Sequence, residues 1–254
     1  KNMPERNRQI YERILLGKGT SAEYAKAFAF LSECLAKYHG RNAFILIDEY
    51  DVPLENAYTE GFYDEMIGFI RSLFESALKT NPYLEKGIIT GCLRISKESI
   101  FTGLNNLEVD TVLHTRYGSG FGFTEDEVKT VLEYYDLGSC MSEVRKWYDG
   151  YLFGSSEIYN PWSILKYVKD HNDKVTEFPL PYWSNTSSNS IVREMIYNAD
   201  NKTKNELETL MSGGTIEKPV HEDITYEDIH ASMDNLWNFL FFTGYLKAGR
   251  QCTD

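Results

Sequence analysis

The stretch Arg41-Asn-Ala-Phe-Ile-Leu-Ile-Asp-Glu-Tyr-Asp51 decides how the first part of this chain folds. Four consecutive apolar residues, Phe44 to Ile47, lead directly into Asp48 and Glu49. An Ile-rich apolar run of this length is typical of a strand that is buried on both faces of a parallel sheet. Because ligands of open α/β sheets bind at the carboxyl ends of the strands, we expect both acids to face a binding site.

Four apolar residues followed by Asp-Glu also form the Walker B pattern of P-loop ATPases. In that pattern the first acid, here Asp48, holds Mg²⁺, and the second, here Glu49, orients or deprotonates the attacking water. A simpler interpretation is that the strand ends in an acidic surface loop, because loops are solvated and Asp favours turns. The motif alone is compatible with both interpretations.

The composition is that of an ordinary globular protein. The chain has 254 residues, enough for two domains, with 42% hydrophobic and 25% charged residues. Its net charge of −12, from 38 acidic and 26 basic residues, argues against a broad surface for nucleic acid. The cysteines are widely spaced and lack the paired spacing of a metal site, which is typical of reduced thiols; they are Cys34, Cys92, Cys140 and Cys252.

The sequence predicts a cytoplasmic protein that does not contact membranes. No segment reaches the roughly 18 apolar residues of a membrane span, and the polar residues 1–9 lack the pattern of a signal peptide. The first residue is Lys1 rather than Met, so we interpret the chain as a fragment of a longer protein.

The residues around the central strand predict α/β alternation. Apolar residues at helical spacing indicate helices over about 4–16, 22–38 and 61–79. The second of these helices is expected to face the core with Ala27, Phe28, Leu31, Cys34, Leu35 and Tyr38. The segment Leu16-Gly-Lys-Gly-Thr20 resembles half of a phosphate loop, but a Gly separates Lys from Thr and a helix precedes it. It is better explained as a helix end followed by a new N-cap at Thr20 or Ser21.

Residues Lys86 to Arg94 predict a second short parallel strand, which ends near Thr90. In P-loop ATPases a polar side chain at this position senses the γ-phosphate, and a cation such as Arg94 would face the same charge. The alternative is that Thr90 starts a turn and Arg94 is a surface base.

The second half of the chain is predicted to be mostly helical. A Thr124-x-x-Glu127 capping box begins one helix, a second covers about 140–148, and Asn160-Pro161 begins a third after a small hairpin. This order is winged-helix-like. Further helices are expected over about 190–198, over 201–212 and from 234, and short strands at 111–114 and 216–220.

Several long blocks together carry a family resemblance. They are Ile45-Leu-Ile-Asp-Glu-Tyr-Asp-Val-Pro-Leu54, Thr90-Gly-Cys-Leu-Arg-Ile-Ser-Lys-Glu-Ser-Ile-Phe-Thr-Gly-Leu-Asn-Asn106, Trp147-Tyr-Asp-Gly-Tyr-Leu-Phe-Gly154, Ile158-Tyr-Asn-Pro-Trp-Ser163 and Tyr182-Trp-Ser-Asn-Thr-Ser-Ser-Asn189. With these blocks the chain resembles the bacterial AAA-ATPase-like proteins, which commonly carry a C-terminal nuclease-like domain of the PD-(D/E)XK type.

The resemblance implies part of a P-loop NTPase parallel sheet with flanking helices over residues 1–122, and a helical, winged-helix-like lid over 123–254. Asp48 and Glu49 would be the Walker B acids, with Asp48 as the metal ligand. Thr90 and Arg94 would line the sensing strand. The cofactors of the intact protein would be Mg²⁺ and ATP.

The family's phosphate loop would lie upstream of residue 1, and the nuclease-like domain would lie beyond residue 254. Without the loop, the groups that hold the β- and γ-phosphates are missing, so we expect the isolated chain to be inactive. ATPases of this broad type often complete their sites between subunits, so the resemblance is compatible with a homo-oligomer.

Two other functions fit the same residues. Asp48, Glu49 and Asp51 could form a metal-dependent hydrolase site that needs no nucleotide. Alternatively, the chain could be a non-catalytic nucleotide-fold module that mediates protein assembly, since its eighteen tyrosines would suit contact surfaces.

Overall fold

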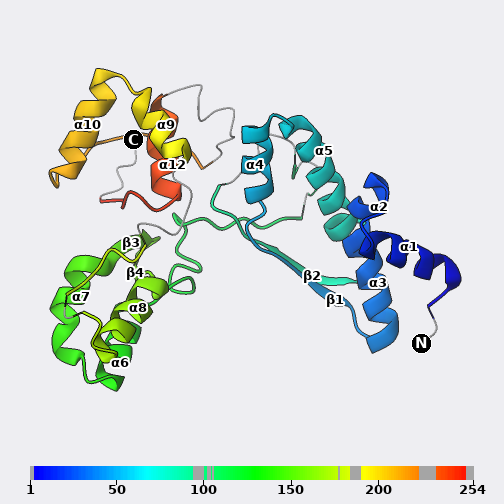
Figure 1. Cartoon of the computed structure of the whole chain (residues 1–254), viewed down its shortest axis with the longest axis horizontal. Coiled ribbons are helices and arrows are strands. Elements are labelled where there is room, and N and C mark those ends of the chain that lie inside the picture. The colour runs from blue at the N-terminus through cyan, green and yellow to red at the C-terminus, as the bar shows by residue number, and fades with distance from the viewer. Residues whose placement is uncertain are drawn as a thin grey trace. The chain divides into compact units, whose positions relative to one another are not determined.

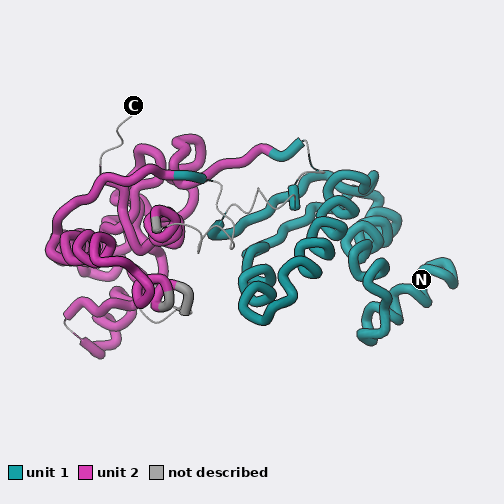
Figure 2. Tube along the Cα trace, turned by 90° about the horizontal axis from the view of Figure 1, so that it is seen from above, with its two compact units in different colours: residues 1–107, 221–231 teal, residues 108–220, 232–254 magenta. Residues whose placement is uncertain are grey.

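The computed structural model describes residues 3–93, 100–101, 104, 106–176, 178–183, 190–222 and 233–249. Over these residues the chain is mixed α/β, with many helices and small sheets (Figure 1). It divides into two compact units, residues 1–107 with 221–231 and residues 108–220 with 232–254 (Figure 2). The domain boundary expected between residues 122 and 123 stays a prediction. Within the described ranges, the helices lack the combination of length and apolar character that crossing a bilayer requires.

The first unit begins with three helices, α1 (Glu5–Leu15), α2 (Ser21–Ala25) and α3 (Ala27–His39). Thr20 caps α2 through a capping box with Glu23, which confirms that residues 16–20 are a helix end and a new N-cap. The helix expected over 22–38 is interrupted at Lys26, so it is two helices. Gly40 ends α3 with φ 68°, a left-handed conformation that suits glycine.

A two-stranded parallel sheet follows, made of β1 (Ala43–Ile47) and β2 (Leu84–Ile89). The connection between the strands is helical and comprises α4 (Val52–Glu60), α5 (Tyr63–Phe74) and the π-helix η1 (Glu75–Lys79). The prediction of one helix over 61–79 missed α4, which starts directly after the acidic loop with Pro53 in its first turn. The parallel pairing of the two predicted strands is confirmed.

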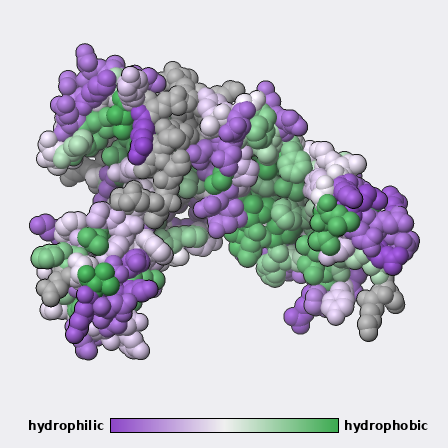
Figure 3. Space-filling view, viewed as in Figure 1, coloured by the Kyte–Doolittle hydropathy of each residue, from purple (hydrophilic) through white to green (hydrophobic). Residues whose placement is uncertain are grey.

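The prediction that β1 is buried on both faces is wrong for the described part of the chain. On one face Ile45 is buried, and a Cβ at Gly87 would lie 2.6 Å from Leu78 of η1. On the other face Phe44 is 65% exposed, Leu46 71% and Ile88 46%. Figure 3 shows this apolar surface over β1 and β2. The difference arises because the helices that connect the strands return over one face of the sheet.

The expected core face of α3 is also largely wrong. Phe28, Leu31, Leu35 and Tyr38 are all exposed. The helix instead buries Ser32, whose hydroxyl donates a hydrogen bond to the carbonyl of Phe28 at 2.7 Å. Helical spacing therefore identified an apolar stripe, but the described residues do not cover that stripe.

The second unit contains α6 (Glu125–Tyr134), the 3₁₀ turn η2 (Gly138–Cys140), α7 (Met141–Tyr148), an antiparallel hairpin of β3 (Asp149–Phe153) and β4 (Ser156–Tyr159), and α8 (Pro161–Asn172). The capping box of Thr124 and the N-cap of Asn160 are confirmed. The predicted order of helix, helix, hairpin and helix is present, while the winged-helix class stays a prediction.

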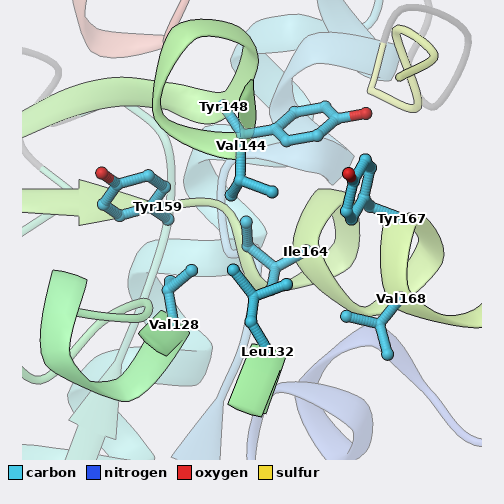
Figure 4. Close-up of a cluster of buried hydrophobic side chains, with 8 residues drawn as sticks. All are labelled: Val128, Leu132, Val144, Tyr148, Tyr159, Ile164, Tyr167 and Val168. Atoms are coloured by element: carbon cyan, nitrogen blue, oxygen red, sulfur yellow. The ribbon is translucent and has the colours of Figure 1, made fainter. Parts of the chain in front are cut away.

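Helices α6, α7 and α8 and strand β4 share one core. Side chains from α6, α7, β4 and α8 point toward one another in Figure 4 and comprise Val128, Leu132, Val144, Tyr148, Tyr159, Ile164, Tyr167 and Val168. The tyrosines bring hydroxyl groups into this core, and at least two of them are hydrogen-bonded. Tyr167 donates to Glu143 at 2.8 Å, and Tyr148 donates to the carbonyl of Leu180 at 2.9 Å.

The described residues after α8 also form α9 (Ser190–Tyr197), α10 (Asn201–Met211) and α12 (Met233–Phe242), close to their predicted positions. The strands expected at 111–114 and 216–220 are wrong, because neither segment is part of a sheet. In the segment that starts at Thr111, the N–H of His114 donates to the Thr111 carbonyl at 3.0 Å and closes a turn. The Val112 carbonyl accepts a hydrogen bond from the N–H of Gly154.

Candidate functional site

The carboxyl ends of β1 and β2 meet at one edge of the parallel sheet. Thr90 N–H donates to the Ile47 carbonyl at 2.8 Å, and Tyr50 N–H donates to the Thr90 carbonyl at 3.0 Å. The backbone pairing therefore continues past the last residue of each strand. It brings the segment after β1, which carries the two predicted acids, alongside Thr90.

The side chains of Asp48 and Thr90 are joined directly. The Thr90 hydroxyl donates a hydrogen bond to Asp48 Oδ1, and the same oxygen accepts the Glu49 N–H at 3.1 Å. Asp48, Glu49 and Thr90 are all exposed. The structure thus brings these three predicted site residues together at an accessible strand end. Arg94, the fourth, lies outside the described residues.

Glu49 has an unusual backbone conformation. Its φ is 50°, in the left-handed region that residues other than glycine rarely adopt. Strained backbone of this kind concentrates at functional sites, because the surrounding structure must hold it in place. Here the hydrogen bond from Glu49 N–H to Asp48 and the backbone pairing of Tyr50 flank the strained residue.

Tyr50 and Asp51 form a second, buried layer next to the acid pair. They are 7% and 4% exposed. Asp51 Oδ2 accepts hydrogen bonds from the N–H groups of Cys92 and Leu93, both at 3.0 Å, and the Tyr50 hydroxyl donates to the Leu93 carbonyl at 2.6 Å. Sequence reasoning treated Asp51 only as a third metal carboxylate. Its burial depends on the loop after β2, for which the local pattern gave no signal.

Burial dominates the electrostatics of this layer. It raises the pKa of Asp51, although the N–H groups of Leu93 and Cys92 partly offset the effect. Although Cys92 as a residue is exposed, desolvation of its thiol, together with the charges of Asp51 and Glu49, raises its pKa to about 11. A thiol that stays protonated at neutral pH is a poor nucleophile, so the chemistry of this site rests on oxygen atoms.

The oxygen donors at the strand ends suit Mg²⁺ but do not enclose it. Mg²⁺ prefers carboxylate, hydroxyl and water oxygens, and it commonly takes further ligands from bound phosphates. Within the described ranges, groups of three or more His, Cys, Asp or Glu side chains that could hold a metal are absent. Asp51 accepts the N–H groups of Cys92 and Leu93, so the three-acid hydrolase built with Asp51 gains no support. Asp48 and Thr90 offer oxygen atoms of the kind that could add to the ligands of a magnesium–nucleotide complex.

The first unit also contains a hollow of about 690 Å³ between α2 and α5. Its lining includes Ala22, Lys26, Phe62 and Met66, but not Asp48, Glu49 or Thr90. The hollow is therefore separate from the strand-end site.

Comparison with known proteins gives two similarities. Residues 1–101 match the AAA-ATPase-like family, described as predicted AAA-ATPase. The chain is also 28% identical, over 158 residues, to an uncharacterized protein in the vnfD 5′ region of Azotobacter chroococcum mcd 1. That similarity covers 62% of this chain but only 29% of the relative. No solved structure gives a significant match.

Proposed function

Because residues 1–101 belong to the AAA-ATPase-like family, we propose that this chain is the Walker B part of an ATP-hydrolysing protein. Asp48 holds Mg²⁺, and Glu49 activates the attacking water. Thr90, directly after β2, senses the γ-phosphate, and the family resemblance implies the same role for Arg94. The observation that carries the proposal is the hydrogen bond from the Thr90 hydroxyl to Asp48 at the shared strand end, with Glu49 next to it.

The two hydrogen bonds to Asp48 suit a metal ligand. In the described part of the chain both end on Oδ1, one from Thr90 and one from Glu49 N–H, so they fix the carboxylate and leave Oδ2 for an ion or its water shell. When bound, Mg²⁺ would neutralise charge on the phosphates. Glu49 is exposed and would take the proton of the water.

The groups that hold the phosphates are proposed to come from a segment outside these 254 residues, as the family resemblance implies. Residues 16–20 are a helix end and an N-cap, so they do not supply a phosphate loop. We therefore expect the isolated chain to hydrolyse no ATP, and the complete gene product to do so with Mg²⁺.

The test is ATP hydrolysis by the complete gene product and by the isolated chain. Glu49→Gln should lower kcat about 100-fold or more while ATP still binds, because the base is lost and the fold is kept. Glu60→Gln, at the exposed end of α4, is the matched control and should leave hydrolysis unchanged. Full activity of Glu49→Gln in the complete protein would reject the proposal. Turnover by the isolated chain that depends on Glu49 would show that these residues already hold a complete site.

One observation favours a second function, a non-catalytic module for protein assembly. Phe44, Leu46 and Ile88 form an exposed apolar sheet face, and contiguous apolar surface commonly marks protein contacts. On this alternative, Leu46→Asp would weaken self-association or partner binding in sedimentation experiments, while Glu49→Gln would change nothing.

A further inference from the structure

Three hydrogen bonds attach the loop after β2 to the end of β1, and they come from residues that the proposed chemistry does not use. Asp51 Oδ2 accepts from the N–H groups of Cys92 and Leu93, and the Tyr50 hydroxyl donates to the Leu93 carbonyl. A carboxylate that receives two N–H groups forms charge-assisted bonds, which are stronger than neutral ones. Asp51 is 4% exposed, and these bonds offset part of the cost of burying its charge.

The loop fits closely against these two side chains. A Cβ at Gly91 would lie 2.6 Å from the Tyr50 ring and 2.7 Å from Asp51 Oδ1. Such distances are shorter than real side-chain contacts, so this position requires glycine. The close fit means that a shift of Asp51 would move the backbone on both sides of Gly91.

Thr90 lies directly before this anchored segment. Its own N–H and carbonyl are bonded to Ile47 and Tyr50, and Cys92 and Leu93, two and three residues further on, are bonded to Asp51. The backbone of Thr90 is therefore held from both sides, which fixes where its hydroxyl can reach. That hydroxyl meets Asp48.

We infer that Asp51 is a positioning residue, which holds the loop after β2 so that the Thr90 hydroxyl stays on the metal-binding carboxylate of Asp48. The inference rests on the proposed function for its catalytic consequence. Its structural part, the hold on Thr90, can be measured without any hydrolysis. Asp51 acts through Thr90 and Asp48 and contacts neither nucleotide nor water in this role.

The test compares four variants with the wild type. Asp51→Ala removes the acceptor, whereas Asp51→Asn removes the charge but keeps an acceptor oxygen. Thr90→Val removes the hydroxyl and serves as the reference for a lost bond to Asp48. Asp64→Asn, at the exposed start of α5, is the charge-matched control.

Two signals in the isolated chain report the positioning. Asp51→Ala should speed amide hydrogen exchange at Cys92 and Leu93 about tenfold or more, since both N–H groups lose their acceptor. The carboxyl ¹³C resonance of Asp48 should move toward its position in Thr90→Val. Asp64→Asn should stay close to the wild type in both measurements. Asp51→Asn should lie between the wild type and Asp51→Ala, because its neutral oxygen still accepts the bonds but more weakly. If Asp51→Ala does not fold, Tyr50→Phe removes a single bond to the same loop and should give smaller shifts in the same direction.

In the complete gene product, Asp51→Ala should lower kcat about tenfold or more while KM for ATP changes less than about twofold, because geometry and not binding is lost. Asp51→Asn should restore most of kcat. Unchanged exchange and an unchanged Asp48 resonance in Asp51→Ala would overturn the inference. Equal loss of kcat in Asp51→Ala and Asp51→Asn would also overturn it, because activity would then depend on the negative charge of Asp51 and not on its hydrogen bonds to the loop. If the wild-type gene product had no ATPase activity, only the proposed function would be rejected. The amide exchange and the Asp48 resonance would still show whether Asp51 positions Thr90.

Discussion

The Thr90 hydroxyl donates a hydrogen bond to Asp48 although the two residues are 42 positions apart in the sequence. The parallel pairing of β1 with β2 creates this relationship, because parallel strands end at the same edge of a sheet. The relationship makes one site from an acidic loop and a polar strand end. The geometry of this site depends on how the segments that follow β1 and β2 are held in place.

Gly91→Ala should destabilise the first unit by about 1–3 kcal/mol, because the new methyl group would overlap the Tyr50 ring and Asp51 Oδ1. Gly68→Ala is the matched control, since a Cβ there meets nothing within 4 Å and Gly68 lies inside α5. That control should be more stable than the wild type by about 0.5–1 kcal/mol. Urea unfolding followed by circular dichroism measures both. Equal stabilities for the two variants would contradict the close fit of the loop.

The sequence predicted that Asp48 and Thr90 each follow a parallel strand, and the ends of such strands share one edge of a sheet. The hydrogen bond between the two side chains is seen only in the structure. The sequence also predicted where helices begin when a side chain caps its own helix, as at Thr20, Thr124 and Asn160. Such features depend on residues three positions apart, so a local pattern contains all the information.

Features that depend on distant packing could not be read in the same way. The role of Asp51 requires Cys92 and Leu93, which are separated from it by α4, α5, η1 and β2. The apolar runs of β1 and α3 indicated apolar faces correctly. Whether a layer covers those faces is a property of the whole sheet, and Phe44 and Tyr38 are exposed in the described structure.

The left-handed backbone of Glu49 predicts an inverted order of stability for two substitutions. With φ at 50°, Glu49→Gly should be more stable than Glu49→Ala by about 1 kcal/mol, because a Cβ is strained in this region. Neither variant keeps the carboxylate, so the difference reports the backbone alone. Thermal unfolding measures it, and the same pair at the exposed helical position Glu65 should show the usual order, with Ala more stable. Greater stability of Glu49→Ala than of Glu49→Gly would contradict the strain.

The shared core of the second unit predicts a large cost for Leu132→Ala. Leu132 is fully buried between α6, α7 and α8, so truncation should leave a cavity and cost about 2–5 kcal/mol. Leu165→Ala makes the same chemical change on α8 at a side chain that is 50% exposed, and its effect should stay within about 0.5 kcal/mol. Denaturant unfolding measures the free energy of unfolding of both variants. Because both make the same Leu-to-Ala change, a difference between them reports the burial of the side chain. Similar costs at the two positions would show that the cluster is not a packed core.

The capping box of α2 predicts a loss of stability in acid. Glu23 accepts hydrogen bonds from Arg13 Nε at 3.2 Å and from Thr20 N–H at 2.9 Å, and these partners lower its pKa to about 2. A carboxylate whose pKa is lower in the folded state stabilises the fold above its unfolded value, and this contribution disappears as the pH falls to the folded value. The stabilisation by Glu23 should therefore be complete above about pH 5 and be lost toward about pH 2.

Glu23→Gln tests this prediction because it removes the charge and keeps the size of the side chain. Its difference from the wild type in free energy of unfolding should be largest near neutral pH and should shrink toward about pH 2. Arg13→Gln removes the other partner, and the double variant completes a cycle that isolates the pair from the bond to Thr20. The coupling free energy should be small because both side chains are partly exposed, and added salt should reduce it further. A difference that stays constant from neutral to acidic pH would show that Glu23 titrates alike in the folded and unfolded chain, and the capping box would then contribute nothing through its charge.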